Sequence, residues 1–119
     1  MAKILIVDDD LDMCEIISDI LKEEGHNPNS SYSGEDALMK IKKNSYDLMV
    51  LDYKLNEISG LIVLEKALQM NPLLKAIMIS AFGDTSVKAR ARELGVSDFL
   101  DKPFDIKRFV QTVKDILKW

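Results

Sequence analysis

Apolar runs alternate along the chain with segments in which apolar residues recur every three to four positions. The clearest runs lie at 4–7, 48–51 and 76–79, and a short one at 99–100 follows. Runs of this kind between polar loops are typical of strands buried on both faces, as in a parallel sheet. A weaker candidate at 26–32 contains Pro28 and almost no apolar residue. Because proline is confined to sheet edges, we expect this strand at the outside of the sheet.

Five segments with helical spacing follow these strands in turn. They lie at 13–21 (ending at Gly25), 34–43, 61–68 (ending before Pro72), 84–94 and 105–118. Ser33 to Asp36 resemble a capping box at the start of the second helix, and Asp105 is the expected N-cap of the last. We interpret the apolar faces of these helices, including Ile16 and Ile106, as core packing.

Strict alternation of strands and helices predicts an α/β fold, in which a five-stranded parallel sheet is covered on both faces and the crossovers are right-handed. No internal repeat, low-complexity segment or linker interrupts the 119 residues. We therefore expect one domain over 1–119.

Composition excludes several classes of protein. The net charge is −4 without a Lys/Arg cluster, which is unfavourable for direct nucleic-acid binding. No apolar stretch is long enough to cross a membrane, and the first residues do not form a signal peptide. Cys14 is the single cysteine, so no intramolecular disulfide is possible, which fits the reducing cytoplasm. We expect Cys14 to be a packed side chain.

Carboxylates follow two of the predicted buried strands. Asp8 and Asp9 come after the first, and Asp52 ends the run at 48–51. Ligands of open α/β sheets bind at the carboxyl ends of the strands, so these three side chains should meet. Carboxylates that crowd together need a cation, and a hard cation such as Mg²⁺ suits them. Asp10 and Asp12 fit better as acidic residues at the start of the following helix.

Asp52 is placed to act on phosphorus. A carboxylate beside a metal and a lysine can act as a nucleophile and form an acyl phosphate. Ser80, at the end of the next strand, can donate a hydrogen bond to a phosphoryl oxygen, and Lys102 supplies a positive charge. Positioning and charge neutralisation of this kind are what phosphoryl transfer requires.

In these motifs the chain resembles a response-regulator receiver domain of two-component signalling, in the CheY-like superfamily. It is similar both to single-domain phosphorelay receivers and to the receivers of NtrC-type regulators. The match covers essentially the whole chain: Asp8 and Asp9 fall on the acidic pair, Asp52 on the phosphoacceptor, Ser80 on the Thr/Ser position, and Lys102-Pro103 on the Lys-Pro.

The resemblance implies a flavodoxin-like sheet of order 2-1-3-4-5 and a cis Lys102–Pro103 bond. It also implies Mg²⁺, or Mn²⁺, on Asp8, Asp9, Asp52 and the backbone carbonyl of Lys54. Catalytic roles fall to Asp52, Ser80 and Lys102, and switch roles to Ser80 and Phe99.

The same resemblance implies a sensor histidine kinase or a histidine phosphotransfer protein as donor. The face formed by 84–118 is then expected to bind an output partner or a second copy. Such a protein is not an enzyme in the ordinary sense, because it catalyses only its own phosphorylation and slow dephosphorylation.

Three positions depart from or qualify the family pattern. Asn56 stands where the family usually has proline, which removes a restraint on φ in the loop after Asp52. Lys54 and Phe82 flank the expected path of the hydrolytic water, and neither can position that water as a carboxamide or carboxylate would. We therefore expect slow loss of the phosphoryl group.

Three other interpretations share part of this pattern. A haloacid-dehalogenase-type phosphatase would need a threonine where Asp12 stands, and a calcium loop would need a glycine where Met13 stands. A pseudo-receiver, with the same fold serving only to bind proteins, is the third alternative. Whether the chain is free-standing or a segment of a longer regulator, and what output it controls, stays open at this level.

Overall fold

The computed structural model describes residues 1–81 and 84–118. Strands and helices alternate strictly within them, as the hydrophobic pattern predicts. In chain order the elements are β1 (Lys3–Val7), α1 (Leu11–Glu23), β2 (Asn27–Ser31), α2 (Gly34–Lys43), β3 (Leu48–Asp52), α3 (Gly60–Met70), β4 (Lys75–Ala81), α4 (Thr85–Leu94), β5 (Asp98–Lys102) and α5 (Ile106–Leu117).

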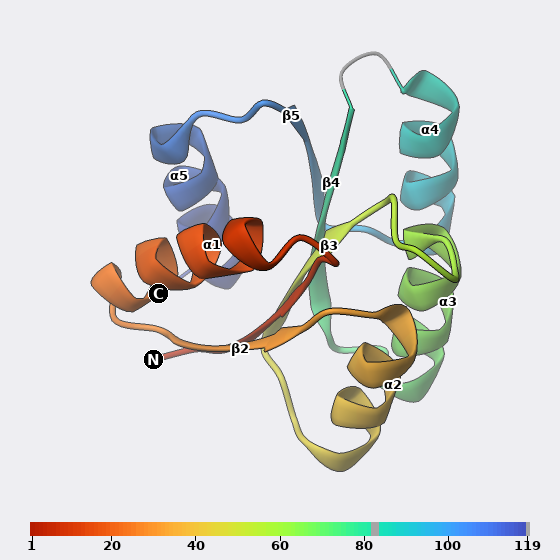
Figure 1. The fold of residues 1–119 in the computed structure, drawn as a ribbon, viewed down its shortest axis with the longest axis horizontal. Helices are drawn as coiled ribbons and strands as arrows, with labels where there is room; N and C mark the ends of the chain where they lie inside the picture. The colour runs from red at the N-terminus through yellow and green to blue at the C-terminus, as the bar shows by residue number, and fades with distance from the viewer. Residues whose placement is uncertain (82–83, 119) are drawn as a thin grey trace.

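The strands form one parallel sheet in the order β2-β1-β3-β4-β5, which confirms the expected topology. β2 is an edge strand, as Pro28 indicated, and pairs only with β1. Figure 1 shows α1 and α5 on one side of the sheet and α2, α3 and α4 on the other. The carboxyl ends of β1, β3 and β4 therefore lie next to one another at one edge.

Alternate residues of the central strands fill two separate cores. Leu5, Val7 and Met49 belong to the core beneath α2, α3 and α4. Ile4 and Ile6 belong to the core beneath α1 and α5. Because both faces of the sheet are covered, β1 and β3 are apolar at nearly every position, which explains the unbroken runs in the sequence.

Two residues of the predicted helix faces are not in the core. Ile16 is 50% exposed and Ile106 is 57% exposed, so the expectation that they pack inside is wrong. Their helices do bury other members of the same stripes, such as Ile17 and Phe109. The apolar stripe is wider than the sheet can cover, and its outer margin stays at the surface.

Helix starts follow the predicted capping chemistry in part. Asp10 and Asp105 are the N-caps of α1 and α5, and each accepts hydrogen bonds from first-turn amides. Ser33 accepts from the amide of Asp36, which is one half of the expected capping box. Cys14 is buried and its thiol donates to the carbonyl of Asp8, in agreement with a packed role. Among the helices described here, none has the length and apolar character that a membrane crossing requires.

Candidate functional site

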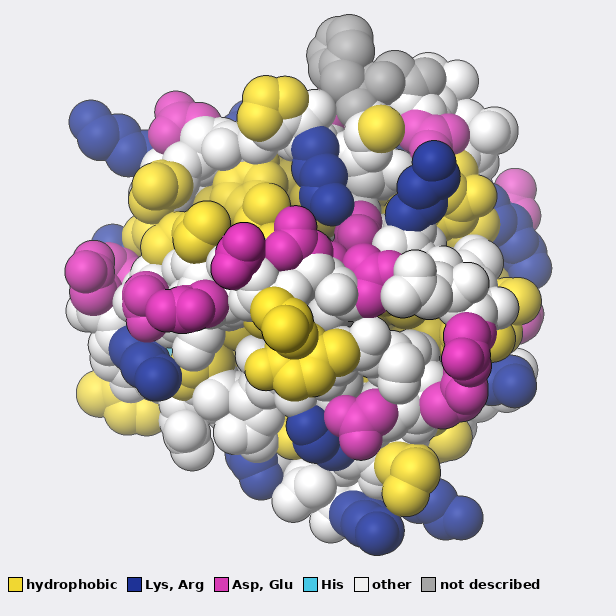
Figure 2. All heavy atoms as spheres, in the orientation of Figure 1, with side chains coloured by type: hydrophobic (Ala, Val, Ile, Leu, Met, Phe, Trp, Pro, Cys, Tyr) yellow, Lys and Arg dark blue, Asp and Glu magenta, His cyan; other side chains and the backbone are white. Residues whose placement is uncertain are grey.

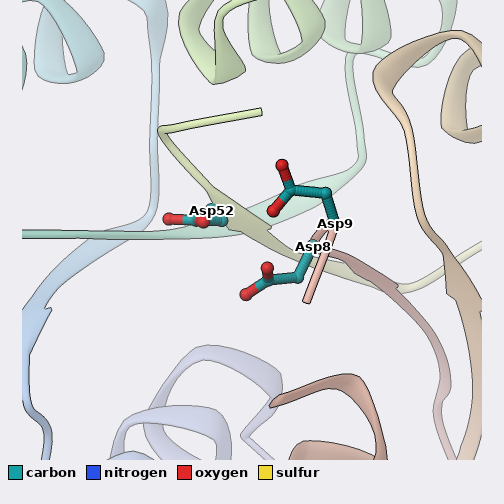
Figure 3. A group of neighbouring side chains, drawn as sticks. All are labelled: Asp8, Asp9 and Asp52. Atoms are coloured by element: carbon teal, nitrogen blue, oxygen red, sulfur yellow. The ribbon is translucent and has the colours of Figure 1, made fainter. Parts of the chain in front are cut away.

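Three carboxylates converge where β1 and β3 end. Asp8 and Asp9 follow β1 directly, and Asp52 is the last residue of β3; each offers an oxygen that lies within 4.8 Å of the others. Figure 3 shows their side chains next to one another, reaching out from two adjacent strand ends. Asp8 is 4% exposed and Asp52 is 7% exposed, whereas Asp9 is only partly buried. The sequence prediction that these residues meet is thus realised in the structure.

The cluster is electrostatically strained. Burial raises the pKa of Asp8 to about 6, and the nearby charges of Asp52 and Asp9 add to this, while the amide of Asp10 opposes it by donating to Asp8 Oδ1 across 2.9 Å. Burial likewise raises the pKa of Asp52, and the neighbouring Lys102 partly offsets it. Such oxygen-only, crowded and partly desolvated donors fit a hard divalent cation, because a bound cation compensates the buried negative charge and the repulsion between the carboxylates.

Lys102 lies on the edge strand β5. It ends β5, two strands away from β3, and its Nζ lies 3.2 Å from Asp52 Oδ1. The peptide bond between Lys102 and Pro103 is cis, as the resemblance implied. Lys102 thus sets a positive charge beside Asp52, at the same hollow that Asp8 and Asp9 line.

Gly60 fixes the loop that follows Asp52. A Cβ at this position would lie 2.4 Å from the carbonyl oxygen of Asp52 and 2.8 Å from Cα of Tyr53. The Gly60 amide also donates to the Tyr53 carbonyl across 2.8 Å. The loop therefore folds back on the strand end that carries Asp52, and Lys54 and Asn56 line the acidic hollow with exposed side chains.

Ser80 and Phe99, the two expected switch residues, lie on the α4 side of the sheet. Ser80 is buried near the end of β4, and its hydroxyl donates to Asp84 Oδ2 across 3.2 Å. Phe99 is almost fully buried, with Lys88 Nζ 5.4 Å from its ring centroid. Sequence reasoning counted Asp84 among the charges of the expected output face but did not pair it with Ser80, because an aspartate before a helix is ordinarily an N-cap.

An apolar hollow adjoins the acidic cluster. Its lining comes from α1, the end of β5 and the start of α5, and Lys102 borders both hollows. Figure 2 shows a hydrophobic area here, next to the acidic side chains. Exposed Ile16 and Ile106 lie in it with Phe104, a grouping that sequence spacing did not reveal. Phe82, expected near the hydrolytic water, lies outside the described residues.

Comparisons with known proteins agree with this arrangement. Residues 4–114 match the family model of the response regulator receiver domain. The chain is 34% identical over 118 residues to the response regulator ArlR of Staphylococcus aureus, covering 99% of this chain and 53% of ArlR. It is 32% identical over 114 residues to the transcriptional regulatory protein ZraR of Salmonella typhimurium, covering 96% of this chain and 26% of ZraR. The chain thus spans about a quarter to a half of these two relatives.

Solved structures show the same fold. A CheY-like receiver domain protein of Methanospirillum hungatei superposes with a TM-score of 0.95 at 27% identity, over 99% of this chain and 94% of that one. NtrX of Brucella abortus gives 0.92 at 31% identity, over 98% of this chain and 27% of that one. The chain therefore belongs to the response regulator receiver family of two-component signalling.

Proposed function

We propose that residues 1–119 act as one receiver domain in which Asp52 accepts a phosphoryl group. The observation that carries this proposal is the juxtaposition of Asp52 with two further carboxylates and with Lys102 Nζ at 3.2 Å. A site that only bound proteins would have no use for a buried, electrostatically strained acidic cluster, which argues against the pseudo-receiver alternative.

Asp52 is the nucleophile in this scheme. A carboxylate oxygen of Asp52 bonds to phosphorus as the bond from phosphorus to the donor breaks, and the bonding pair leaves with the donor. Lys102 and Ser80 bind the oxygens of the transferred group, the first by charge and the second by its hydroxyl. Both residues thereby stabilise negative charge that the transfer concentrates at this edge of the sheet.

Asp8, Asp9 and Asp52 would hold Mg²⁺ together with the backbone carbonyl of Lys54, and Mn²⁺ would serve as well. When bound, the ion neutralises charge on the phosphoryl oxygens. The raised pKa values of Asp8 and Asp52 support this assignment, since they mark negative charge without sufficient compensation.

The donor protein docks on the apolar hollow between α1 and the start of α5. Its phosphohistidine must reach Asp52, and Lys102 lines both this hollow and the acidic one. A partner that covers Ile16, Phe104 and Ile106 would bury apolar surface directly beside the phosphoacceptor.

The output face lies on α4, β5 and α5, over 84–118, where an output partner or a second copy binds. Ser80 and Phe99 connect the phosphoacceptor to this face by a population shift between two packed states. Phe99, Lys88 and Arg108 line a surface hollow of about 570 Å³ there. The acidic net charge favours protein over nucleic acid as the direct partner. The cytoplasm is the expected compartment.

Self-dephosphorylation is slow in this scheme, and the protein turns over no substrate other than its own phosphoryl group. Lys54 lines the acidic hollow, where its cation can pair with the phosphoryl group but cannot position an attacking water. Lys54→Asn should therefore shorten the lifetime of the phosphorylated protein; an unchanged lifetime would count against this role.

Incubation with acetyl phosphate and Mg²⁺, followed by intact mass measurement, tests the proposed function. The parent should gain one phosphoryl group, and both Asp52→Asn and omission of Mg²⁺ should prevent it. An exposed-site control, Asp115→Asn, should behave like the parent. A parent that gains no phosphoryl group under these conditions would favour the pseudo-receiver.

A further inference from the structure

The hydroxyl hydrogen of Ser80 already has an acceptor. Ser80 Oγ donates to Asp84 Oδ2 across 3.2 Å. A serine hydroxyl has one hydrogen to donate, and an ionised carboxylate only accepts. A phosphoryl oxygen on Asp52 also only accepts. The carboxylate of Asp84 and the phosphoryl group therefore compete for the same hydrogen.

Asp84 occupies an N-cap position without capping its helix. It is the residue before α4, yet its side chain accepts no hydrogen bond from the first turn. The N-cap residues of the other four described helices, Asp10, Ser33, Ser59 and Asp105, all accept from first-turn amides. The Asp84 carboxylate is thus directed to Ser80 in place of the helix amides.

One turn further along α4, Lys88 contacts the same face of the sheet. Its Nζ lies 2.9 Å from Asp101 Oδ1 and 5.4 Å from the Phe99 ring centroid. Asp101 pairs in register with Ser80 across β4 and β5. α4 therefore touches both switch positions through two polar residues, and only the contact at Asp84 involves the hydroxyl that the phosphoryl group needs.

We propose that Asp84 is a positioning residue that retains the Ser80 hydroxyl in the unphosphorylated protein and so sets the affinity of the site for a phosphoryl group. This inference rests on the proposed role of Asp52. Binding of a phosphoryl group must first break the bond from Ser80 to Asp84. The freed carboxylate can then accept from the amides of α4, which links occupancy of the site to the start of that helix.

Beryllofluoride with Mg²⁺, a non-covalent phosphoryl analogue, provides the probe, and its Kd is measured by calorimetric titration. Asp84→Ala should bind it about three- to tenfold more tightly than the parent, because the hydroxyl no longer has a competing acceptor. The substitution removes no capping bond of α4, but it leaves the buried Ser80 hydroxyl without its acceptor, so the variant should melt somewhat below the parent while binding the analogue more tightly. Unchanged or weaker binding by Asp84→Ala would overturn the inference.

A double-mutant cycle separates this competition from the loss of one negative charge. In a Ser80→Ala background, Asp84→Ala should leave the Kd unchanged, since no hydroxyl remains to be released. An equal gain in both backgrounds would show that charge alone acts, and would overturn the inference. Glu23→Ala, which removes a carboxylate from the exposed end of α1, should bind like the parent. A parent that binds no beryllofluoride would overturn the proposed function itself, and this inference with it.

Discussion

Asp9 is the most exposed of the three carboxylates in the acidic cluster. Burial is the main cause of the raised pKa of Asp8 and of Asp52, and the charge of Asp9 adds to both. In metal-free protein, Asp9→Asn should therefore raise the melting temperature by several degrees, and it should abolish phosphorylation because a metal donor is lost. Calorimetric melting and intact mass measure the two effects. Phosphorylation of Asp9→Asn at the parent rate would refute the metal assignment.

Gly60 is the residue that decides how tightly the loop packs against Asp52. Gly60→Ala places a methyl group against the Asp52 carbonyl, which is backbone and cannot yield easily. We expect a loss of about 2–3 kcal/mol in the free energy of unfolding, measured by urea denaturation. Lys66→Ala, at an exposed position of the same helix, is the control and should change the free energy of unfolding little. Equal losses in the two variants would contradict the crowding argument.

At the scale of elements, hydrophobic periodicity was enough to predict the helices and the strands β1, β3, β4 and β5, but not β2, which has almost no apolar residue. Covered faces force unbroken apolar runs in β1 and β3, and Pro28 marked β2 as an edge. Periodicity identifies an apolar face but not what covers it, so Ile16 and Ile106 were wrongly assigned to the core. The same limit applies to Asp84: its residue type predicts a cap, whereas its partner, Ser80, depends on how β4 and α4 meet.

At the same scale, the proposed output face should respond to a phosphoryl analogue. Beryllofluoride with Mg²⁺ should change amide hydrogen exchange in α4, β5 and α5, since Ser80 and Phe99 lie under α4 while Lys88 ties α4 to Asp101. Exchange in α2, on the same side of the sheet but distant from β5 in the sheet order, should stay unchanged. Changes confined to α2, or equal changes in Asp52→Asn, would contradict the assignment of this face.

At the scale of the whole molecule, the acidic cluster makes stability depend on pH. The pKa of Asp8 is about 6 in the folded protein against 3.8 ordinarily, so the folded state binds more protons between these values. The free energy of unfolding of the metal-free protein should therefore fall as pH rises from about 4 to 6. Asp8→Asn should remove this loss, and urea denaturation across the pH range measures it.

His26 should make stability depend on pH in the opposite direction. Burial lowers its pKa, and its Nδ1 accepts from the amide of Ala2 across 3.2 Å, which ties the N-terminal segment to the loop before β2. The contribution of His26 to the free energy of unfolding should therefore be lost as pH falls below about 6.5, the ordinary pKa of histidine. His26→Asn, whose amide oxygen can accept in place of Nδ1, should remove that loss. Difference curves of the same sign for Asp8→Asn and His26→Asn would contradict both assignments.

In the proposed function, Asp52 alone among the three neighbouring carboxylates is phosphorylated. Chemical trapping tests this assignment most directly. Borohydride reduces an acyl phosphate to an alcohol, so treatment of the phosphorylated protein converts the phosphorylated aspartate to homoserine, which peptide mass spectrometry can locate. Homoserine should be found at position 52 and not at 8 or 9. Homoserine at Asp8 or Asp9, or none in protein that has gained a phosphoryl group, would contradict the account.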